Sequence, residues 1–193
     1  MMGHSRDGSI RKLWVADTAA FRDHLLRLDP QTRRNRFGMS AGDDFIKRYA
    51  ENSFALDTLI HGVFVGGDLV GVGELRSLGK THEDAEAAFS VETDWQGRGF
   101  GSRLMERVLL AARNRRIERL YMNCLASNGN MQRLARRHGA DLQYEGGDVV
   151  GIMVPETPTP VSYLREAVRD SYGWASAMVD LQKRALPTNL FGA

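Results

Sequence analysis

The stretch DWQGRGFGSRLMERVLL, residues 94–110, places three glycines within five positions directly before an amphipathic helix pattern. The first turn of a helix leaves backbone N–H groups without partners and carries a partial positive charge. Glycines at 97, 99 and 101 let the chain bend tightly and let the backbone approach a ligand closely. The stretch therefore predicts a site for a phosphate or pyrophosphate, with Arg98 as an added cation. A glycine-rich turn that only begins the helix is the alternative.

Two other phosphate-binding motifs fit this stretch poorly. A P-loop ends in Gly-Lys-Ser/Thr, whereas residues 101–103 read Gly-Ser-Arg. A dinucleotide-binding fingerprint reads G-x-G-x-x-G after the first strand of a βαβ unit. Here the glycines read G-x-G-x-G and follow three strand-like segments.

The composition is that of an ordinary globular protein of 193 residues, with a net charge of +2 and one cysteine, Cys124. The length suits one domain with an extension, and the small charge does not indicate a nucleic-acid partner. A single cysteine allows no disulfide within the chain, which favours a reducing cytoplasm. No apolar run reaches the roughly 18 residues that span a membrane, and the N-terminus lacks the apolar centre of a signal peptide. The five histidines are scattered, so no metal is expected.

Hydrophobic periodicity along the chain alternates between strand and helix patterns. Two β-rich runs flank Gly66-Gly67 and predict an antiparallel hairpin. Pro30 interrupts the helical pattern that begins after Asp17. The expected elements are a strand at 9–16, helices after Asp17 and over 43–51, a hairpin over 58–78, a strand at 85–92, a helix at 101–115, a strand at 118–126, a helix within 128–140 and a hairpin over 141–154. This order predicts an α/β fold with a mixed, mostly antiparallel sheet, a parallel pair flanking the central helix, and helices on both faces.

Three prolines, at 155, 158 and 160, mark a boundary near the end of this order. We therefore expect a main domain over 9–156 and a C-terminal helical extension over 157–193. The extension is amphipathic, with Leu164, Val168 and Tyr172 at helical spacing. It is expected either to cap the domain or to pair with another subunit in a homodimer.

The motif Gln96-Gly97-Arg98-Gly99-Phe100-Gly101 resembles the signature of the GNAT-type N-acetyltransferases. The order of elements from about residue 9 to 155 matches that family as well. Residues 85–140 look particularly similar to the bacterial branch that contains protein-lysine acetyltransferase domains. The resemblance implies a GNAT-like sheet whose strands splay at a cofactor cleft. It also implies acetyl-CoA, or another acyl-CoA, as co-substrate and an amine as acceptor.

The same resemblance implies which residues contact the cofactor. Backbone N–H groups of the loop would bind the pyrophosphate, and the backbone near Ser90 would pair with the pantetheine amides. Asn128 follows the fifth expected strand, and Met131 would line the same wall. The full set of expected cofactor-binding residues is Phe89, Ser90, Val91, Gln96, Gly97, Arg98, Gly99, Phe100, Gly101, Ser102, Asn128 and Met131.

Amine acetylation requires a base, because a lysine amine has a pKa near 10.4 and the attacking form is neutral. Glu86 is the first candidate, since the pattern E-x-x-F-x-V over residues 86–91 resembles the strand that carries the base in lysine-acetylating members. Apolar neighbours would raise its pKa. Glu74 is the second candidate and Glu92 the third. A solvated carboxylate at a strand edge is the alternative for Glu86, and a backbone N–H near Val91 is expected to stabilise the thioester oxygen.

The chain departs from the family at one position, because Ala135 stands where many members have a tyrosine that protonates the leaving thiolate. Solvent would then supply that proton. Arginines at 33, 34 and 36 are interpreted as a solvated basic loop, with recognition of an acidic acceptor as the alternative. Cys124 is interpreted as a buried strand residue rather than a nucleophile.

Three classes of function fit these patterns. An acyltransferase acting on a primary amine is the first, and a non-catalytic acyl-CoA-binding regulatory module is the second. An arginine-rich nucleic-acid binder is the third, and it would show a steep salt dependence. The acceptor itself is not indicated, because a fold does not determine a substrate.

Overall fold

The computed structural model describes residues 8–79, 81 and 83–185, with the backbone alone for 173–185. The polar N-terminal residues 1–7 and the last part of the expected extension, 186–193, lie outside the described residues.

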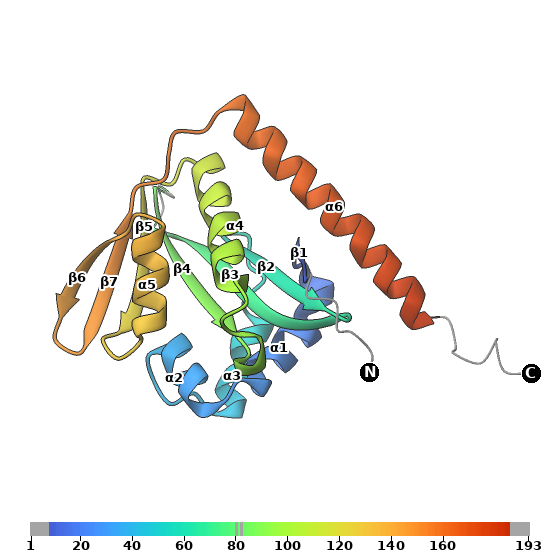
Figure 1. The fold of residues 1–193 in the computed structure, drawn as a ribbon, viewed down its shortest axis with the longest axis horizontal. Coiled ribbons are helices and arrows are strands. Elements are labelled where there is room, and N and C mark those ends of the chain that lie inside the picture. Colours follow the sequence, from blue (N-terminus) through green and yellow to red (C-terminus); the bar gives the residue numbers. More distant parts are fainter. Residues whose placement is uncertain (1–7, 80, 82, 186–193) are drawn as a thin grey trace, which may run out of the picture.

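The described residues form a seven-stranded sheet in the order β1-β2-β3-β4-β5-β7-β6 (Figure 1). β4 and β5 run parallel, and all the other neighbouring strands of this sheet run antiparallel. This confirms the expected mixed, mostly antiparallel sheet. The strands are β1 (Ser9–Lys12), β2 (Thr58–Val65), β3 (Asp68–Leu78), β4 (Asp84–Val91), β5 (Arg119–Leu125), β6 (Asp141–Glu145) and β7 (Asp148–Met153).

The helices cover both faces of this sheet, as expected. Alternation along β2 sends successive side chains to opposite faces: Ile60 packs in a cluster with Phe21 and Ile46, whereas Leu59 packs with residues of α4 such as Val108. Figure 1 shows α4 in front of the strands. The helices are α1 (Thr18–Arg27), α2 (Pro30–Phe37), α3 (Asp43–Glu51), α4 (Phe100–Asn114), α5 (Gly129–Arg137) and α6 (Pro160–Ala185).

Helix α2 is an element that the sequence interpretation missed. Pro30 was expected to break a helix, but it occupies the first turn of a new one, where its missing N–H costs nothing. The Asp29 carboxylate caps this helix by accepting from the backbone N–H groups of Gln31 and Thr32 at 3.0 Å each. Gly38, with φ of +70°, ends it. The loop expected between two helices is therefore a helix that lies over the sheet.

The first strand is shorter than expected, because β1 ends at Lys12 and a 3-10 turn covers Val15–Asp17. The Asp17 carboxylate explains the turn. It accepts from the Trp14 backbone N–H at 2.9 Å and pairs with Arg11 at 2.7 Å. Burial raises the pKa of Asp17, but the bonds from Arg11 and Trp14 outweigh this and lower it overall.

Helix α6 packs on the domain through its polar side. Ser162 is buried against Asn114 at the end of α4, and Glu166 pairs with Arg115 at 2.9 Å. Its described apolar side chains face solvent: Val161, Leu164, Val168 and Tyr172 are 64%, 64%, 43% and 75% exposed. Figure 1 shows α6 as a long helix that starts near the top of α4 and runs past β1.

Candidate active site

The glycine loop enters α4 through two left-handed residues. Gly97 has φ of +71° and Gly99 has φ of +83°, and a Cβ added at either position would meet no atom within 4 Å. Glycine is therefore favoured here by backbone conformation rather than by crowding. The first helical bond runs from the Arg103 N–H to the Gly99 carbonyl at 3.1 Å. The N–H groups of residues 100–102 come before it and have no partner within the helix, which suits an anion.

The side chains of the loop hold its shape. The Gln96 amide donates to the Val91 carbonyl at 2.9 Å, which ties the loop to the end of β4. The Arg98 guanidinium lies 4.5 Å from the centroid of the Trp95 ring. Phe100 is 2% exposed and packs in the core, so only its backbone is available to a ligand. The Ser102 hydroxyl lies 2.9 Å from Nε2 of His138, a residue that follows α5.

Strands β4 and β5 diverge after three residue pairs. They are in register only from Asp84 with Arg119 to Glu86 with Tyr121, although β4 continues to Val91 and β5 to Leu125. The Glu92 N–H donates to the Val70 carbonyl of β3 at 2.9 Å. Because backbone groups alternate in direction along a strand, those of Phe89 and Val91 point to the unpaired side. Those of Ser90 point back to β3.

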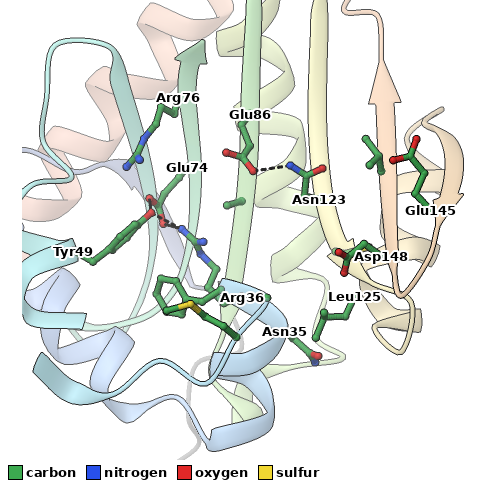
Figure 2. Close-up of a pocket in the computed structure, with 16 residues that line it drawn as sticks. Asn35, Arg36, Tyr49, Glu74, Arg76, Glu86, Asn123, Leu125, Glu145 and Asp148 are labelled. Carbon is green, nitrogen blue, oxygen red and sulfur yellow. Dashed lines mark hydrogen bonds and ion pairs between the residues drawn. The ribbon is translucent and has the colours of Figure 1, made fainter. Parts of the chain in front are cut away.

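A cavity of about 470 Å³ lies beside this divergence (Figure 2). Glu86 lies in the middle of its wall, where its carboxylate accepts from the Asn123 amide at 3.0 Å. Arg76 lies opposite Glu86 in the register of β3 and β4. The expected apolar surroundings of Glu86 are therefore replaced by polar ones. Figure 2 shows Glu145 and Asp148 on the side of the cavity away from Glu74 and Tyr49.

Glu74 lines the same cavity but is bound on both oxygens. Oε1 accepts from Arg36, and Oε2 accepts from the Tyr49 hydroxyl at 2.7 Å. The Arg36 and Glu74 side chains are 6% and 4% exposed. Burial opposes the charge of Arg36, but Glu74 and Tyr49 outweigh it and raise its pKa. Burial and the Glu74 carboxylate raise the pKa of Tyr49 to about 12, so this hydroxyl stays a donor.

The arginines of α2 are therefore not a solvated basic loop. Arg36 is the buried partner of Glu74, and Arg33 donates to the Leu28 carbonyl and to Asp43. Arg34 alone of the three is exposed. The sequence interpretation missed these pairs because the partners lie far apart along the chain.

Helix α5 lies beside the first turn of α4. A Cβ added at Gly101 would lie 3.5 Å from Leu134. Asn128 caps α5 through its side-chain oxygen, which accepts from the Met131 N–H at 3.2 Å. Met131 packs partly buried against the core, and Ala135 is 2% exposed within it. Ala135, which stands where many members of the family have a tyrosine, has no group that could protonate a leaving thiolate.

Cys124 is buried, as expected, and lines the cavity from β5. Burial raises the pKa of its thiol, with a smaller contribution from Asp148. The thiol is thus largely protonated at neutral pH, which does not favour a nucleophile.

A buried histidine at β4 was also missed. His24 of α1 is 0% exposed and lies 3.0 Å from the Ser90 hydroxyl and 2.9 Å from Glu92. A signal for its burial is present in the sequence, because His24 shares the helical spacing of Phe21, Leu25 and Leu28. Nothing in the sequence indicates its partners.

Within residues 8–79, 81 and 83–185, no group of His, Cys, Asp and Glu side chains has an arrangement suited to a metal ion. No helix in the described part of the chain combines the length and the apolar character that a membrane span requires.

Several solved structures share the fold of this chain. The GNAT domain of PAT from S. lividans is 22% identical with a TM-score of 0.66, covering 76% of this chain and 90% of that one. RimL, a ribosomal L7/L12 alpha-N-protein acetyltransferase in complex with coenzyme A, is 15% identical with a TM-score of 0.64, covering 81% and 98%. The PaiA N-acetyltransferase from Thermoplasma acidophilum, also in complex with coenzyme A, is 16% identical with a TM-score of 0.58, covering 77% and 99%.

These identities are low and show a shared fold. The sequence itself matches the model of the acetyltransferase (GNAT) family over residues 22–140, more than half of the chain. The chain therefore belongs to the GNAT family of acetyltransferases.

Proposed function

We propose that this protein transfers an acetyl group from acetyl-CoA to a primary amine, with Glu86 as the general base. The observation that carries the proposal is the position of Glu86 in the cavity wall, on β4, where β4 and β5 lose their pairing. RimL and PaiA, which share this fold, are described in complex with coenzyme A. An acyl-CoA chain lying along the unpaired edge would bring its thioester near the cavity.

The backbone supplies the expected contacts to the co-substrate. Phe89 offers its N–H and C=O groups to the pantetheine amides, whereas the Val91 carbonyl already accepts from Gln96. The N–H groups of Phe100 to Ser102 bind the pyrophosphate, with Arg98 nearby. This fits the loop, because the first turn of α4 contains no acidic residue that would repel a phosphate.

Glu86 takes the proton of the attacking amine, directly or through one water. The Asn123 amide, 3.0 Å away, orients the carboxylate. A Val91 N–H stabilises the negative charge that develops on the thioester oxygen. Because Ala135 supplies no proton, the leaving thiolate takes one from solvent.

The charges of the cavity favour a cationic acceptor. The charges of Arg36 and Glu74 neutralise each other. The remaining charged residues of the lining are one arginine, Arg76, and three acidic residues, Glu86, Glu145 and Asp148. The cavity wall thus carries a net charge of −2, which attracts a protonated amine before it loses its proton.

The test is release of free thiol from acetyl-CoA with a panel of primary amines that includes lysine peptides, with mass spectrometry of the acetylated product. Wild-type protein should release thiol with at least one cationic amine. If calorimetry shows that acetyl-CoA binds but no amine is acetylated, the result would favour a non-catalytic acyl-CoA-binding regulatory module over an enzyme.

A matched pair of variants tests the loop. Gly99→Ala and Gly146→Ala both place a side chain at positive φ, +83° and +60°, where an added Cβ meets nothing. Both should lose about 1 kcal/mol of stability. Gly99→Ala alone should weaken acetyl-CoA binding, by about tenfold or more, because it shifts the N–H groups of α4. Equal affinity in the two variants would contradict the assignment of the loop.

A further inference from the structure

A partly buried cluster between α1 and the end of β4 holds both neighbours of Val91. It consists of His24, Ser90, Glu92 and Arg27. His24 contacts Ser90 through Nε2 at 3.0 Å and Glu92 through Nδ1 at 2.9 Å. Arg27 donates to Glu92 at 2.8 Å and to the Leu69 carbonyl of β3 at 2.7 Å. Helix α1 therefore binds the residues before and after Val91 through one side chain.

The donors and acceptors of this cluster follow from its charges. Burial raises the pKa of Glu92, but His24 and Arg27 outweigh this and lower it, so the carboxylate is ionised and accepts. Burial lowers the pKa of His24, although Glu92 partly opposes the shift, so the ring is neutral at pH 7. The His24 Nδ1–H then donates to Glu92, and Nε2 accepts from the Ser90 hydroxyl.

This order of bonds is also that of a serine–histidine–acid triad, but the serine has no access to a substrate. Ser90 is 4% exposed and does not line the cavity that contains Glu86. Its hydroxyl is directed to α1, on the face of β4 opposite to Phe89. A nucleophilic role for Ser90 is therefore not supported.

The position of the cluster points instead to a role in orienting the backbone groups of Val91. Val91 points its N–H and C=O to the unpaired side of β4, where no strand partner orients them. The Gln96 amide occupies the carbonyl, at 2.9 Å. At this end β4 is paired with β3 alone, and the cluster adds side-chain bonds to the residues on both sides of Val91.

We propose that His24 is a positioning residue for acetyl transfer: through Ser90 and Glu92 it holds the Val91 N–H in the direction that meets the acyl-CoA. This rests on the proposed function. None of the four residues lines the cavity that contains Glu86, so we expect the cluster to affect the co-substrate rather than the amine.

The test compares Ser90→Ala with Ser162→Ala. Both serines are 4% exposed and hydrogen-bonded through their hydroxyls, but Ser162 lies at the start of α6, bound to Asn114. Glu92→Gln is a second variant, which keeps an acceptor for His24 and loses the charge that binds Arg27. Each protein is measured for thermal midpoint, acetyl-CoA dissociation constant, and KM for each substrate.

Ser162→Ala removes bonds to Asn114 and Thr159, whereas Ser90→Ala removes the one to His24, so Ser162→Ala should lower the thermal midpoint at least as much as Ser90→Ala does. Ser90→Ala should raise the dissociation constant and KM for acetyl-CoA by roughly five- to tenfold, the effect of one lost hydrogen bond, and leave the amine KM unchanged. Glu92→Gln should also raise the dissociation constant and KM for acetyl-CoA, by a smaller factor. Ser162→Ala should match wild type in all three constants.

An acetyl-CoA affinity equal to that of wild type in both Ser90→Ala and Glu92→Gln would overturn the positioning role, whatever happens to stability. An equal rise in both KM values would also overturn it, since that marks general damage to the fold. A wild-type protein that binds no acyl-CoA would instead refute the proposed function.

Discussion

The two glutamates of the cavity, Glu74 and Glu86, lie on adjacent strands and face the same space, yet their surroundings differ. Glu74 is 3% exposed and has donors on both oxygens, from Arg36 and Tyr49. Glu86 is half-buried and accepts from Asn123. A carboxylate that is fully paired is poorly placed to accept a proton, whereas one with an open oxygen can do so. The comparison favours Glu86 over Glu74 as the proposed base.

The largest expected effect of this difference is on stability. Glu74→Gln removes the negative partner of a buried guanidinium and should cost about 3–5 kcal/mol of unfolding free energy. Glu86→Gln should change it by less than about 0.5 kcal/mol, because glutamine keeps an oxygen that can accept from Asn123. Urea unfolding of the two variants measures both values. Similar losses of unfolding free energy in the two variants would contradict the distinction between Glu74 and Glu86.

Tyr49→Phe sharpens the same comparison with a smaller effect. It removes one donor from Glu74 and should cost about 1.5–3 kcal/mol, the usual range for a hydrogen bond to a charged group. The pKa of Tyr49 is raised from 10.0 to about 12, so the folded state keeps a proton that the unfolded state loses. The stabilisation by the hydrogen bond from Tyr49 to Glu74 is therefore complete below pH 10 and is lost as the pH rises through about 12.

Unfolding curves of wild type and Tyr49→Phe between pH 8 and pH 12 test this sign. The stability difference between the two proteins should shrink as the pH rises from 10. A difference that stays constant, or grows, would show that Tyr49 is not a protonated donor to Glu74.

The smallest expected effect concerns Glu86 and its hydrogen bond from Asn123. Asn123→Ala removes the amide that orients Glu86 and should lower kcat by about three- to tenfold, since an exposed hydrogen bond contributes around 1 kcal/mol. The unfolding free energy should hardly change, because Asn123 is exposed. Steady-state kinetics with a saturating amine measures the loss. An unchanged kcat would mean that Glu86 needs no orientation by β5.

The elements that local signals specify could be predicted from the sequence. The glycine loop before α4 and the turn at Gly66-Gly67 each depend on residues adjacent in the chain, and both are present. Helix α2 was missed because Pro30 is equally typical of a break and of a first helical turn. Its meaning depended on Asp29, whose capping bonds identify the start.

The pairings inside the site could not be predicted in the same way. Arg36 and Glu74 are 38 residues apart, and His24 and Ser90 are 66 apart. Whether such side chains meet depends on strand register, and a slip of one residue sends a side chain to the other face. Glu86 and Glu74 were both predicted as site residues, but their ranking rested on the resemblance, and the contacts that separate them come from the packing of α2 and α3.

The most direct test of this account is turnover by Glu86→Gln. With an amine that wild type acetylates, kcat should fall by about 10²–10⁴-fold, the usual contribution of a general base. The acetyl-CoA dissociation constant and the thermal midpoint should stay at wild-type values. A Glu86→Gln variant that turns over at a rate near wild type would contradict the central claim that Glu86 accepts the proton of the amine.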